Sequence, residues 1–194
     1  MKLYDMANKT TKPIKNPSKL KAFLTLVEKS GEKYYVMAKL QLNTGRRICD
    51  IREKRVSDIM QQTMRFREYF VLKEKKTGKG TSIRLNDEVR KVLKDYIFGN
   101  DLWYDDFLFP GRGDNSAISY QQVWRVFQET AYQLNIEDFG THSLRKTWGY
   151  NAYKKTKNIG LLMKAFRHSS AEETLRYIGI DQDEEDELYS IISL

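Results

Sequence analysis

Apolar residues recur along the first fifty positions at the spacing of helices with one buried face. The first predicted helix opens at Asn16-Pro17-Ser18 and ends at Gly31, because Asn caps helices, Pro is favoured in their first turn and Gly ends them. A second helix is predicted over 33–42 and a short one over 47–54, separated by Asn43-Thr44-Gly45. The buried face of the first helix is predicted to carry Leu20, Phe23, Leu24 and Val27.

A strand-like pattern replaces the helical one in the middle of the chain. The segment 66–73 is rich in aromatic and aliphatic residues, and 81–85 alternates as a half-buried strand does. Between them, 74–80 combines glycine with several lysines, which is typical of an exposed turn. We therefore predict a β-hairpin with a cationic tip.

Helical periodicity returns after the hairpin and continues to residue 178. Asn86 is suited to cap a helix that reaches Phe98. A loop at 108–113 precedes four more predicted helices, which cover 119–134, 142–154, 158–166 and 171–178. The predicted fold is mixed α/β (α+β), mainly α-helical with a small antiparallel β-sheet.

The 194 residues contain no internal repeat and no long linker, so we expect one domain over 17–180. Residues 1–16 are polar, rich in lysine and without periodicity. We expect them to form a flexible basic arm, which either follows a DNA backbone or stays a disordered tail. Residues 181–194, acidic and then apolar, are expected to form a C-terminal tail.

The net charge of +8 is unevenly distributed. Six of the 26 acidic residues lie in 181–187, so residues 1–180 hold 34 basic and 20 acidic residues, a net charge of +14. A basic body favours polyanions, because each cation that meets a phosphate releases a condensed counterion. Double-stranded DNA is the leading candidate partner, although some ribosomal and membrane-surface proteins have a similar composition.

Several other classes are excluded or disfavoured by composition. No run approaches the roughly 18 apolar residues that span a bilayer, and the N-terminus lacks the apolar core of a secretory signal. Cys49 is the single cysteine, and neither of the two histidines has a carboxylate or thiolate at metal-ligand spacing. We expect a cytoplasmic, nucleoid-associated protein with no metal, no cofactor and no membrane partner.

Three short segments near the C-terminus combine side chains that bind a phosphate with one that can attack it. They are 141–147 (THSLRKT), 166–170 (FRHSS) and 174–178 (TLRYI). On a helix, His142 and Arg145 lie three residues apart, so both are able to face one phosphate group. An isolated H-x-x-R is common by chance, and it is the ordered series that favours catalysis.

The series resembles the C-terminal half of the tyrosine recombinases, the phage integrase family, whose pattern is H-x-x-R, a G-H-S-S-like step and T-x-x-Y. Upstream, 43–51 (NTGRRICDI) is similar to the family's T-G-x-R-I-x-E-L box, and 75–79 (KKTGK) to its hairpin K-T-G-K. The likeness covers roughly 17–180. It implies the catalytic-domain fold of this family.

The resemblance also implies the roles of individual residues. Negative charge builds on the non-bridging oxygens of a phosphodiester under attack, and two arginines are suited to hold them. Tyr177 is the expected nucleophile, His142 the expected base and His168 a hydrogen-bond donor to the phosphate. The implied catalytic set is Arg47, Lys76, His142, Arg145, His168 and Tyr177.

The departing 5′-oxygen needs a proton, which a lysine on the hairpin is able to supply. Lys76 matches the family's lysine, while Lys75 and Lys79 remain alternatives because the tip holds several lysines. The other basic residues in or beside these segments are expected to contact DNA. The expected DNA contacts are Arg46, Lys73, Lys75, Lys79, Arg84, Lys146 and Arg167.

The function implied is that of a site-specific DNA recombinase or integrase, which cleaves and rejoins strands through a 3′-phosphotyrosine without ATP or metal. The resemblance further implies a homotetramer on two DNA duplexes, with the protein a monomer when free. In the family a C-terminal tail commonly packs into a neighbouring subunit, so 181–194 is expected either to do so or to fold back on its own domain.

Two features depart from the family pattern. Arg167 stands where the family typically has glycine, so it either adds a phosphate contact or alters how His168 is presented. The separate helical DNA-binding domain that commonly precedes the catalytic one does not fit ahead of the first box. A naturally short recombinase and a fragment of a longer chain are the two alternatives.

Two other functions compete with recombination. A type IB topoisomerase-like enzyme shares the phosphotyrosine chemistry but relaxes one duplex without a partner. The second alternative is a DNA-binding module of the same fold that has lost catalysis. Arg167 in place of the family's glycine favours this alternative, whereas the complete catalytic set argues against it.

Overall fold

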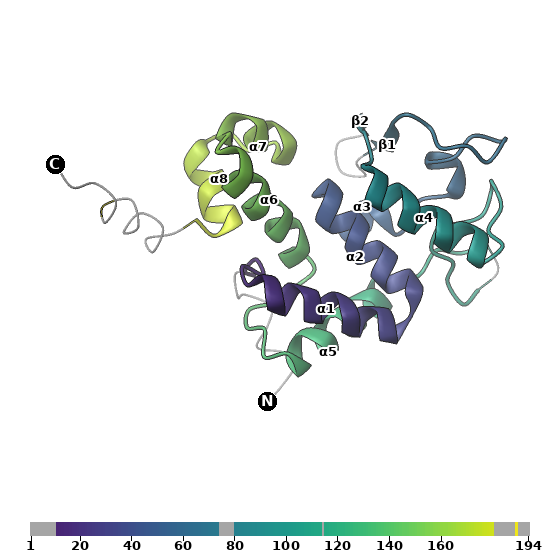
Figure 1. The fold of residues 1–194 in the computed structure, drawn as a ribbon, viewed down its shortest axis with the longest axis horizontal. Coiled ribbons are helices and arrows are strands. Elements are labelled where there is room, and N and C mark those ends of the chain that lie inside the picture. The colour runs from purple at the N-terminus through teal and green to yellow at the C-terminus, as the bar shows by residue number, and fades with distance from the viewer. Residues whose placement is uncertain (1–10, 74–79, 114, 181–188, 190–194) are drawn as a thin grey trace.

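The helices and strands follow the predicted order along the chain. The structure, a computed structural model, describes residues 11–73, 80–113, 115–180 and 189. It confirms the mixed α/β fold class, mainly helical with a two-stranded antiparallel sheet. The elements labelled in Figure 1 are α1 (Pro17–Ser30), α2 (Glu32–Thr44), α3 (Ile48–Ile51), the 3-10 helix η2 (Val56–Asp58), β1 (Phe70–Lys73), β2 (Gly80–Ile83), α4 (Asp87–Gly99), α5 (Tyr120–Gln133), α6 (Ser143–Thr156), α7 (Ile159–Phe166) and α8 (Ala171–Ile178).

Side-chain caps explain why several helices begin where they do. Asn16 accepts a hydrogen bond from the Lys19 amide (3.0 Å), which satisfies a free N–H in the first turn of α1. Asn86 accepts one from the Val89 amide (2.9 Å) at the start of α4. Because such caps act within a few residues, the sequence predicted these helix starts closely.

The hairpin has shorter strands than the sequence predicted. β1 and β2 pair in antiparallel register, but β1 begins at Phe70 rather than at Phe66. The Arg67 amide donates to the Ile59 carbonyl (2.8 Å), so the residues before Phe70 pair with the segment after η2 instead of with β2. The predicted cationic tip, 74–79, lies outside the described residues.

The third helix, α3, is also shorter than the predicted 47–54. The Leu108 amide donates to the Lys54 carbonyl (2.7 Å), and the Val56 amide donates to the Asp106 carbonyl (3.0 Å). These bonds hold the chain after α3 in an extended path beside a distant loop. At the other end of α3, Arg47 lies just before the first helical residue, in an extended conformation, rather than inside the helix.

Most apolar side chains form one core between α1, α2, α4 and α5. Phe23, Met37, Leu93 and Phe127 are buried in it, and the rings of Phe23 and Phe127 pack edge to face with centroids 5.8 Å apart. Figure 1 shows α6, α7 and α8 on one side of α2, and α4 with the hairpin on the other. The helix α2 therefore connects the two sides of the molecule.

A smaller apolar cluster joins α6, α7 and α8. Leu162, Phe166 and Ile178 are buried in it, and the ring of Tyr177 packs against them. Gly149 of α6 permits the close approach, since a Cβ atom there would lie 2.6 Å from Phe166 and 2.7 Å from Ile178. This second cluster fixes the position of the Tyr177 ring.

Residues 11–16, assigned above to the basic arm, pack against the domain. Ile14 is 4% exposed, and its amide donates to Thr147 Oγ1 of α6 (2.8 Å). Ile14 thus belongs to the folded core. Residues 1–10 lie outside the described residues, as does the predicted tail, 181–194, apart from Tyr189.

Candidate active site

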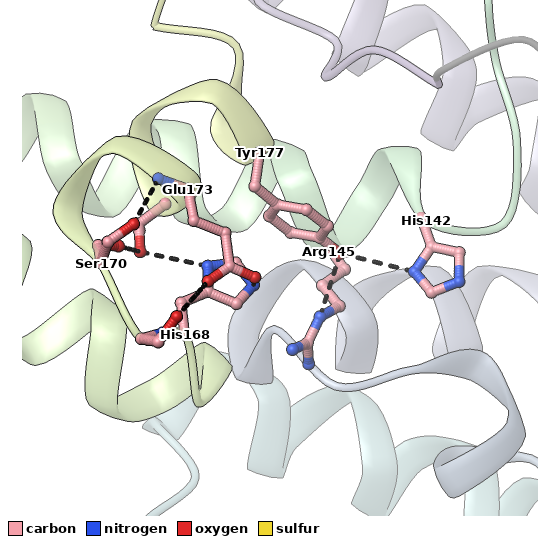
Figure 2. A network of polar contacts seen from close by, with 8 residues as sticks. His142, Arg145, His168, Ser170, Glu173 and Tyr177 are labelled. Atoms are coloured by element: carbon pink, nitrogen blue, oxygen red, sulfur yellow. Dashed lines mark hydrogen bonds and ion pairs between the residues drawn. The ribbon is translucent and has the colours of Figure 1, made fainter.

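Tyr177 lies in the last turn of α8, with its hydroxyl turned toward the start of α6. The hydroxyl accepts a hydrogen bond from Arg145 Nε (3.2 Å) and lies 3.4 Å from His142 Nδ1, as Figure 2 shows. His142 directly precedes α6 and has a helical backbone conformation, which keeps it on the same face as Arg145. The packing of α6 and α8 thus brings two predicted catalytic residues to the phenolic oxygen of a third.

Arg145 is a buried cation held on several sides. It is 2% exposed, and its Nη1 donates to the Gly45 carbonyl at the end of α2 (2.5 Å). The guanidinium lies 4.7 Å from the centre of the Phe166 ring. Burial lowers the pKa of Arg145, but a guanidinium remains charged at neutral pH. The site therefore contains a fixed planar cation beside the Tyr177 hydroxyl.

Gly45 is required by the way α2 meets α6. Its φ of 62° lies in the left-handed region, where a side chain is disfavoured. A Cβ atom there would also lie 2.2 Å from the Trp148 ring. Glycine at this position lets the backbone carbonyl reach Arg145, which gives the glycine of the 43–51 box a structural role.

The surroundings of His142 favour its neutral form. Burial lowers the pKa of His142 below its ordinary value of 6.5, and the charges of Arg145, Arg47 and Lys146 lower it further. At pH 7 one ring nitrogen is consequently free to accept a proton. The ring is suited to act as a base toward the Tyr177 hydroxyl.

His168 lies against the Tyr177 ring, with the two ring centroids 5.0 Å apart. Its Nδ1 lies 3.1 Å from Thr174 Oγ1, and its Nε2 lies 3.9 Å from a Glu173 carboxylate oxygen. Burial lowers the pKa of His168, and the Glu173 charge opposes that change. Figure 2 shows this group as a second polar network beside the first.

Glu173 is a site residue that the sequence analysis did not identify. Its carboxylate accepts hydrogen bonds from the Ser169 amide (3.0 Å) and the Ser169 hydroxyl (3.2 Å). The hydrogen bond from the Ser169 amide is the main reason that the pKa of Glu173 lies below its ordinary value of 4.5. Ser170 and Glu173 form the S-x-x-E pattern of a helix start, which is the sequence signal for this arrangement.

A pocket of about 180 Å³ lies beside His142. Arg47 is exposed at this pocket, and its charge lowers the pKa of both histidines. The hydroxyls of Tyr120 and Thr141 lie 3.0 Å apart, and no sequence pattern had indicated Tyr120. The pocket is lined by Arg47, Ile48, Cys49, Tyr120, Thr141 and His142.

Two of the residues expected to contact DNA are buried in the free protein. Arg46 and Lys146 are 6% and 5% exposed. Lys146 Nζ donates to the Thr11 carbonyl and lies 5.0 Å from the centre of the Tyr177 ring. Tertiary packing buries both side chains, as it buries Arg145, and their contact with DNA stays a prediction.

Three further expected DNA contacts, Lys73, Arg84 and Arg167, lie on or near the hairpin. Arg84 follows β2 and is exposed, and Arg167 is exposed with its Nη2 donating to Thr81 Oγ1 of β2 (3.3 Å). Lys73 is the last residue of β1. The catalytic candidate Lys76 and its alternatives, Lys75 and Lys79, lie outside the described residues.

Both histidines of the chain lie beside Tyr177. Within the described ranges, no group of three His, Cys, Asp or Glu side chains is arranged to hold a metal ion. None of the helices in those ranges has the length and apolar character needed to cross a membrane.

The sequence matches the model of the phage integrase family over residues 15–184. It is also similar to the probable integrase/recombinase YoeC of Bacillus subtilis (strain 168). The two are 30% identical over 171 residues, which cover 88% of this chain and 91% of YoeC. The family match includes all the described residues around Tyr177.

The fold is similar to those of solved recombinase structures. The XerH site-specific recombinase bound to a palindromic difH substrate matches with a TM-score of 0.72 and 20% identity, over 95% of this chain and 54% of that one. A lambda integrase (75–356) dimer bound to a COC′ core site matches with a TM-score of 0.65 and 17% identity, over 89% and 60%. This chain thus spans about half the length of XerH. The sequence match and the fold agree, and the chain belongs to the phage integrase family, with the fold of a tyrosine recombinase catalytic domain.

Proposed function

We propose that this chain cleaves and rejoins DNA at specific sites through a covalent 3′-phosphotyrosine intermediate. Tyr177 Oη attacks the phosphorus of a phosphodiester, the new O–P bond forms as the bond to the 5′-oxygen breaks, and that strand leaves with a 5′-hydroxyl. The observation that carries the proposal is the position of the Tyr177 hydroxyl, within hydrogen-bond distance of both Arg145 and His142.

His142 takes the phenolic proton as Tyr177 attacks. Its lowered pKa leaves the imidazole neutral near pH 7, which a base requires. The 3.4 Å separation between Tyr177 Oη and His142 Nδ1 is long for a hydrogen bond. Such catalytic contacts commonly shorten when the substrate binds.

Arg145 and Arg47 stabilise the charge that develops on the phosphate. Arg145 is immobilised by Gly45 and Phe166, so little reorganisation is needed when the negative charge appears. Its Nε already contacts the Tyr177 oxygen that becomes bonded to phosphorus. Arg47 is exposed beside His142, where a DNA strand is able to approach it.

Lys76 protonates the departing 5′-oxygen in this proposal, as its place between β1 and β2 suggests. The phosphotyrosine ester conserves the energy of the broken bond. A 5′-hydroxyl can therefore attack the ester, release Tyr177 and restore a phosphodiester without ATP. When that hydroxyl belongs to another duplex, the outcome is recombination.

Double-stranded DNA is the substrate of this reaction, and the net charge of +8 favours its binding. Arg84 and Arg167 are exposed cations on the side of the hairpin and are suited to contact its phosphates. Exchange between two duplexes requires four active subunits, so we propose a homotetramer on DNA that forms from monomers. The protein would act in the cytoplasm, on the nucleoid.

The test uses nicked duplexes that trap the cleaved state, prepared from DNA flanking the gene and from a randomised pool. Wild type should form a covalent protein–DNA adduct on a denaturing gel, and Tyr177→Phe should form none because it lacks the attacking oxygen. Tyr132→Phe is the matched control, since Tyr132 is 83% exposed on α5. Sequencing the trapped strand identifies the cleavage site.

The outcomes separate the competing functions. An adduct that persists in Tyr177→Phe would contradict the assigned nucleophile. DNA binding without any adduct in wild type would favour an inert module of the same fold. Rapid relaxation of a supercoiled plasmid without a specific site would favour a type IB topoisomerase-like activity.

A further inference from the structure

The Thr174 hydroxyl has a single proton and two polar neighbours. Thr174 is fully buried in α8 (0% exposed), and its Oγ1 donates to the Ser170 carbonyl (3.0 Å). The same Oγ1 lies 3.1 Å from His168 Nδ1. A carbonyl has no proton to give back, so the hydroxyl proton is committed to Ser170. The contact with His168 then requires a proton on Nδ1, with Thr174 Oγ1 as the acceptor.

This arrangement determines what the other nitrogen of His168 can do. A neutral imidazole has one ring proton, so a proton on Nδ1 leaves a lone pair on Nε2. Phosphate oxygens are also acceptors, and a lone pair facing one is repulsive. His168 in this tautomer is therefore able to donate to a phosphate only after the ring has gained a second proton, on Nε2.

The charges that face His168 come from three elements. Glu173 of α8 lies 3.9 Å from Nε2 and favours protonation, whereas burial and the charges of Arg145 on α6 and Arg47 before α3 oppose it. The combined effect lowers the pKa of His168 below its ordinary value of 6.5. A bound phosphodiester would add negative charge and favour proton uptake.

We propose that Thr174 is a positioning residue that holds His168 in the Nδ1–H form, so that binding of a phosphodiester is coupled to uptake of one proton by Nε2. The imidazolium formed in this way donates from Nε2 to a non-bridging oxygen, and Glu173 partly balances its charge. The phosphate in this scheme rests on the proposed function. The tautomer is a property of the free protein and is testable without DNA.

The first test is long-range ¹H–¹⁵N NMR on histidine-labelled protein at about pH 8, where histidine is neutral. The chain has two histidines, so His142→Gln leaves only the signals of His168. We expect a protonated-type Nδ1 and a lone-pair-type Nε2. A protonated Nε2 in this spectrum overturns the proposal, whether or not any Thr174 variant folds.

Thr174→Val tests the cause of the tautomer, because valine keeps the shape but accepts no hydrogen bond. We expect the Nε2–H form to become dominant in this variant. Thr130→Val is the matched control, since Thr130 is also buried (3% exposed) and its hydroxyl donates to the Val126 carbonyl (2.8 Å). An unchanged His168 tautomer in a folded Thr174→Val protein would refute the role of Thr174.

The second test follows adduct formation on the nicked duplexes as a function of pH. The wild-type rate should fall on the alkaline side by up to about tenfold per pH unit, because one proton on His168 is required. Thr174→Val should show a flatter alkaline limb, since its neutral His168 is able to donate from Nε2. Identical limbs in the two proteins would contradict the coupling. Failure of wild type to form any adduct would count against the proposed function, while the NMR result still decides the tautomer.

Discussion

At the residue scale, the chemistry around Tyr177 depends on charges from separate parts of the chain. Arg145 and His142 come from the start of α6, and Arg47 comes from the turn between α2 and α3. Their positive charges act with burial to keep His142 neutral. In acid, the unfolded chain therefore binds a proton at this histidine more readily than the folded protein does. The same electrostatics that suit His142 for proton transfer therefore affect folding.

Stability should decrease as the pH falls below neutrality. The folded-state pKa of His142 is below 6.5, so the folded protein binds fewer protons there than the unfolded chain, and protonation favours unfolding. The loss begins near pH 6.5 and continues down to the folded-state pKa, with a slope of at most about 1.4 kcal/mol per pH unit for one proton. Denaturant unfolding of wild type and His142→Gln between about pH 7 and 5 measures it.

His142→Gln should show a smaller decrease in unfolding free energy over that range. Glu173 does not affect this comparison. Its lowered pKa changes the unfolding free energy only below about pH 4.5, the pKa of the carboxyl in the unfolded chain. Equal slopes for the two proteins would mean that His142 contributes no such linkage.

The backbone conformation of Arg167 explains why the family typically has glycine before the second histidine. This residue directly follows α7 as its C-cap, with φ 61° and ψ 44°, in the left-handed region where glycine is favoured. Arg167→Gly should therefore stabilise the protein by up to about 1 kcal/mol, raising Tm by about 2–4 °C in thermal unfolding. Lys157→Gly is the matched control, because Lys157 ends α6 at φ 52°.

The difference between these two variants reports on the Arg167 side chain. If the hydrogen bond from Arg167 to Thr81 contributes to stability, the rise in Tm of Arg167→Gly should be smaller than that of Lys157→Gly. A decrease in Tm for both variants would show that backbone strain is not the dominant effect at these positions.

At the element scale, α6 organises the site. His142 is its N-cap residue, its first turn carries Arg145, its middle packs on α7 and α8, and Arg145 reaches back to the end of α2. The position of Tyr177 therefore depends on how closely α8 packs on α6. Gly149 sets that distance, because a larger residue would meet Phe166 and Ile178.

Gly149→Ala should destabilise the cluster of α6, α7 and α8. The added Cβ would lie 2.6 Å from Phe166 and 2.7 Å from Ile178, and such overpacking typically costs about 1–3 kcal/mol. We expect a lower Tm and slower adduct formation, since Ile178 is next to Tyr177. Gly160→Ala is the control on α7, where the nearest atom would be 3.7 Å away. A Tm for Gly149→Ala equal to that of the control would contradict the packing argument.

At the scale of the whole molecule, two apolar clusters divide the catalytic residues. Arg47 lies on the side of the main core, whereas Tyr177 belongs to the smaller cluster and His168 packs against its Phe166 ring. The start of α6 and residues 11–16 connect the two, through the Arg145 bond to Gly45 and the Ile14 bond to Thr147. The active site thus depends on contacts between segments that are far apart in the sequence.

The order of the elements, the family resemblance and most residues of the candidate site, though not Glu173 or Tyr120, were predictable from the sequence alone. Caps such as Asn16 and Asn86, and the spacing of apolar residues, act over a few positions, so they are readable without a fold. The strand predicted from Phe66 begins only at Phe70, because the Arg67 amide donates to the Ile59 carbonyl rather than to β2.

Which basic residues are exposed, and which atoms come into contact, depends on the tertiary fold. Arg46 and Lys146 look like any other cation in the sequence, yet long-range packing buries them. The bond between Arg145 and Gly45 and the contact between His142 and Tyr177 also join segments that are far apart in the sequence. Burial and the pKa changes that follow from it are properties of the assembled surroundings, which no local pattern specifies.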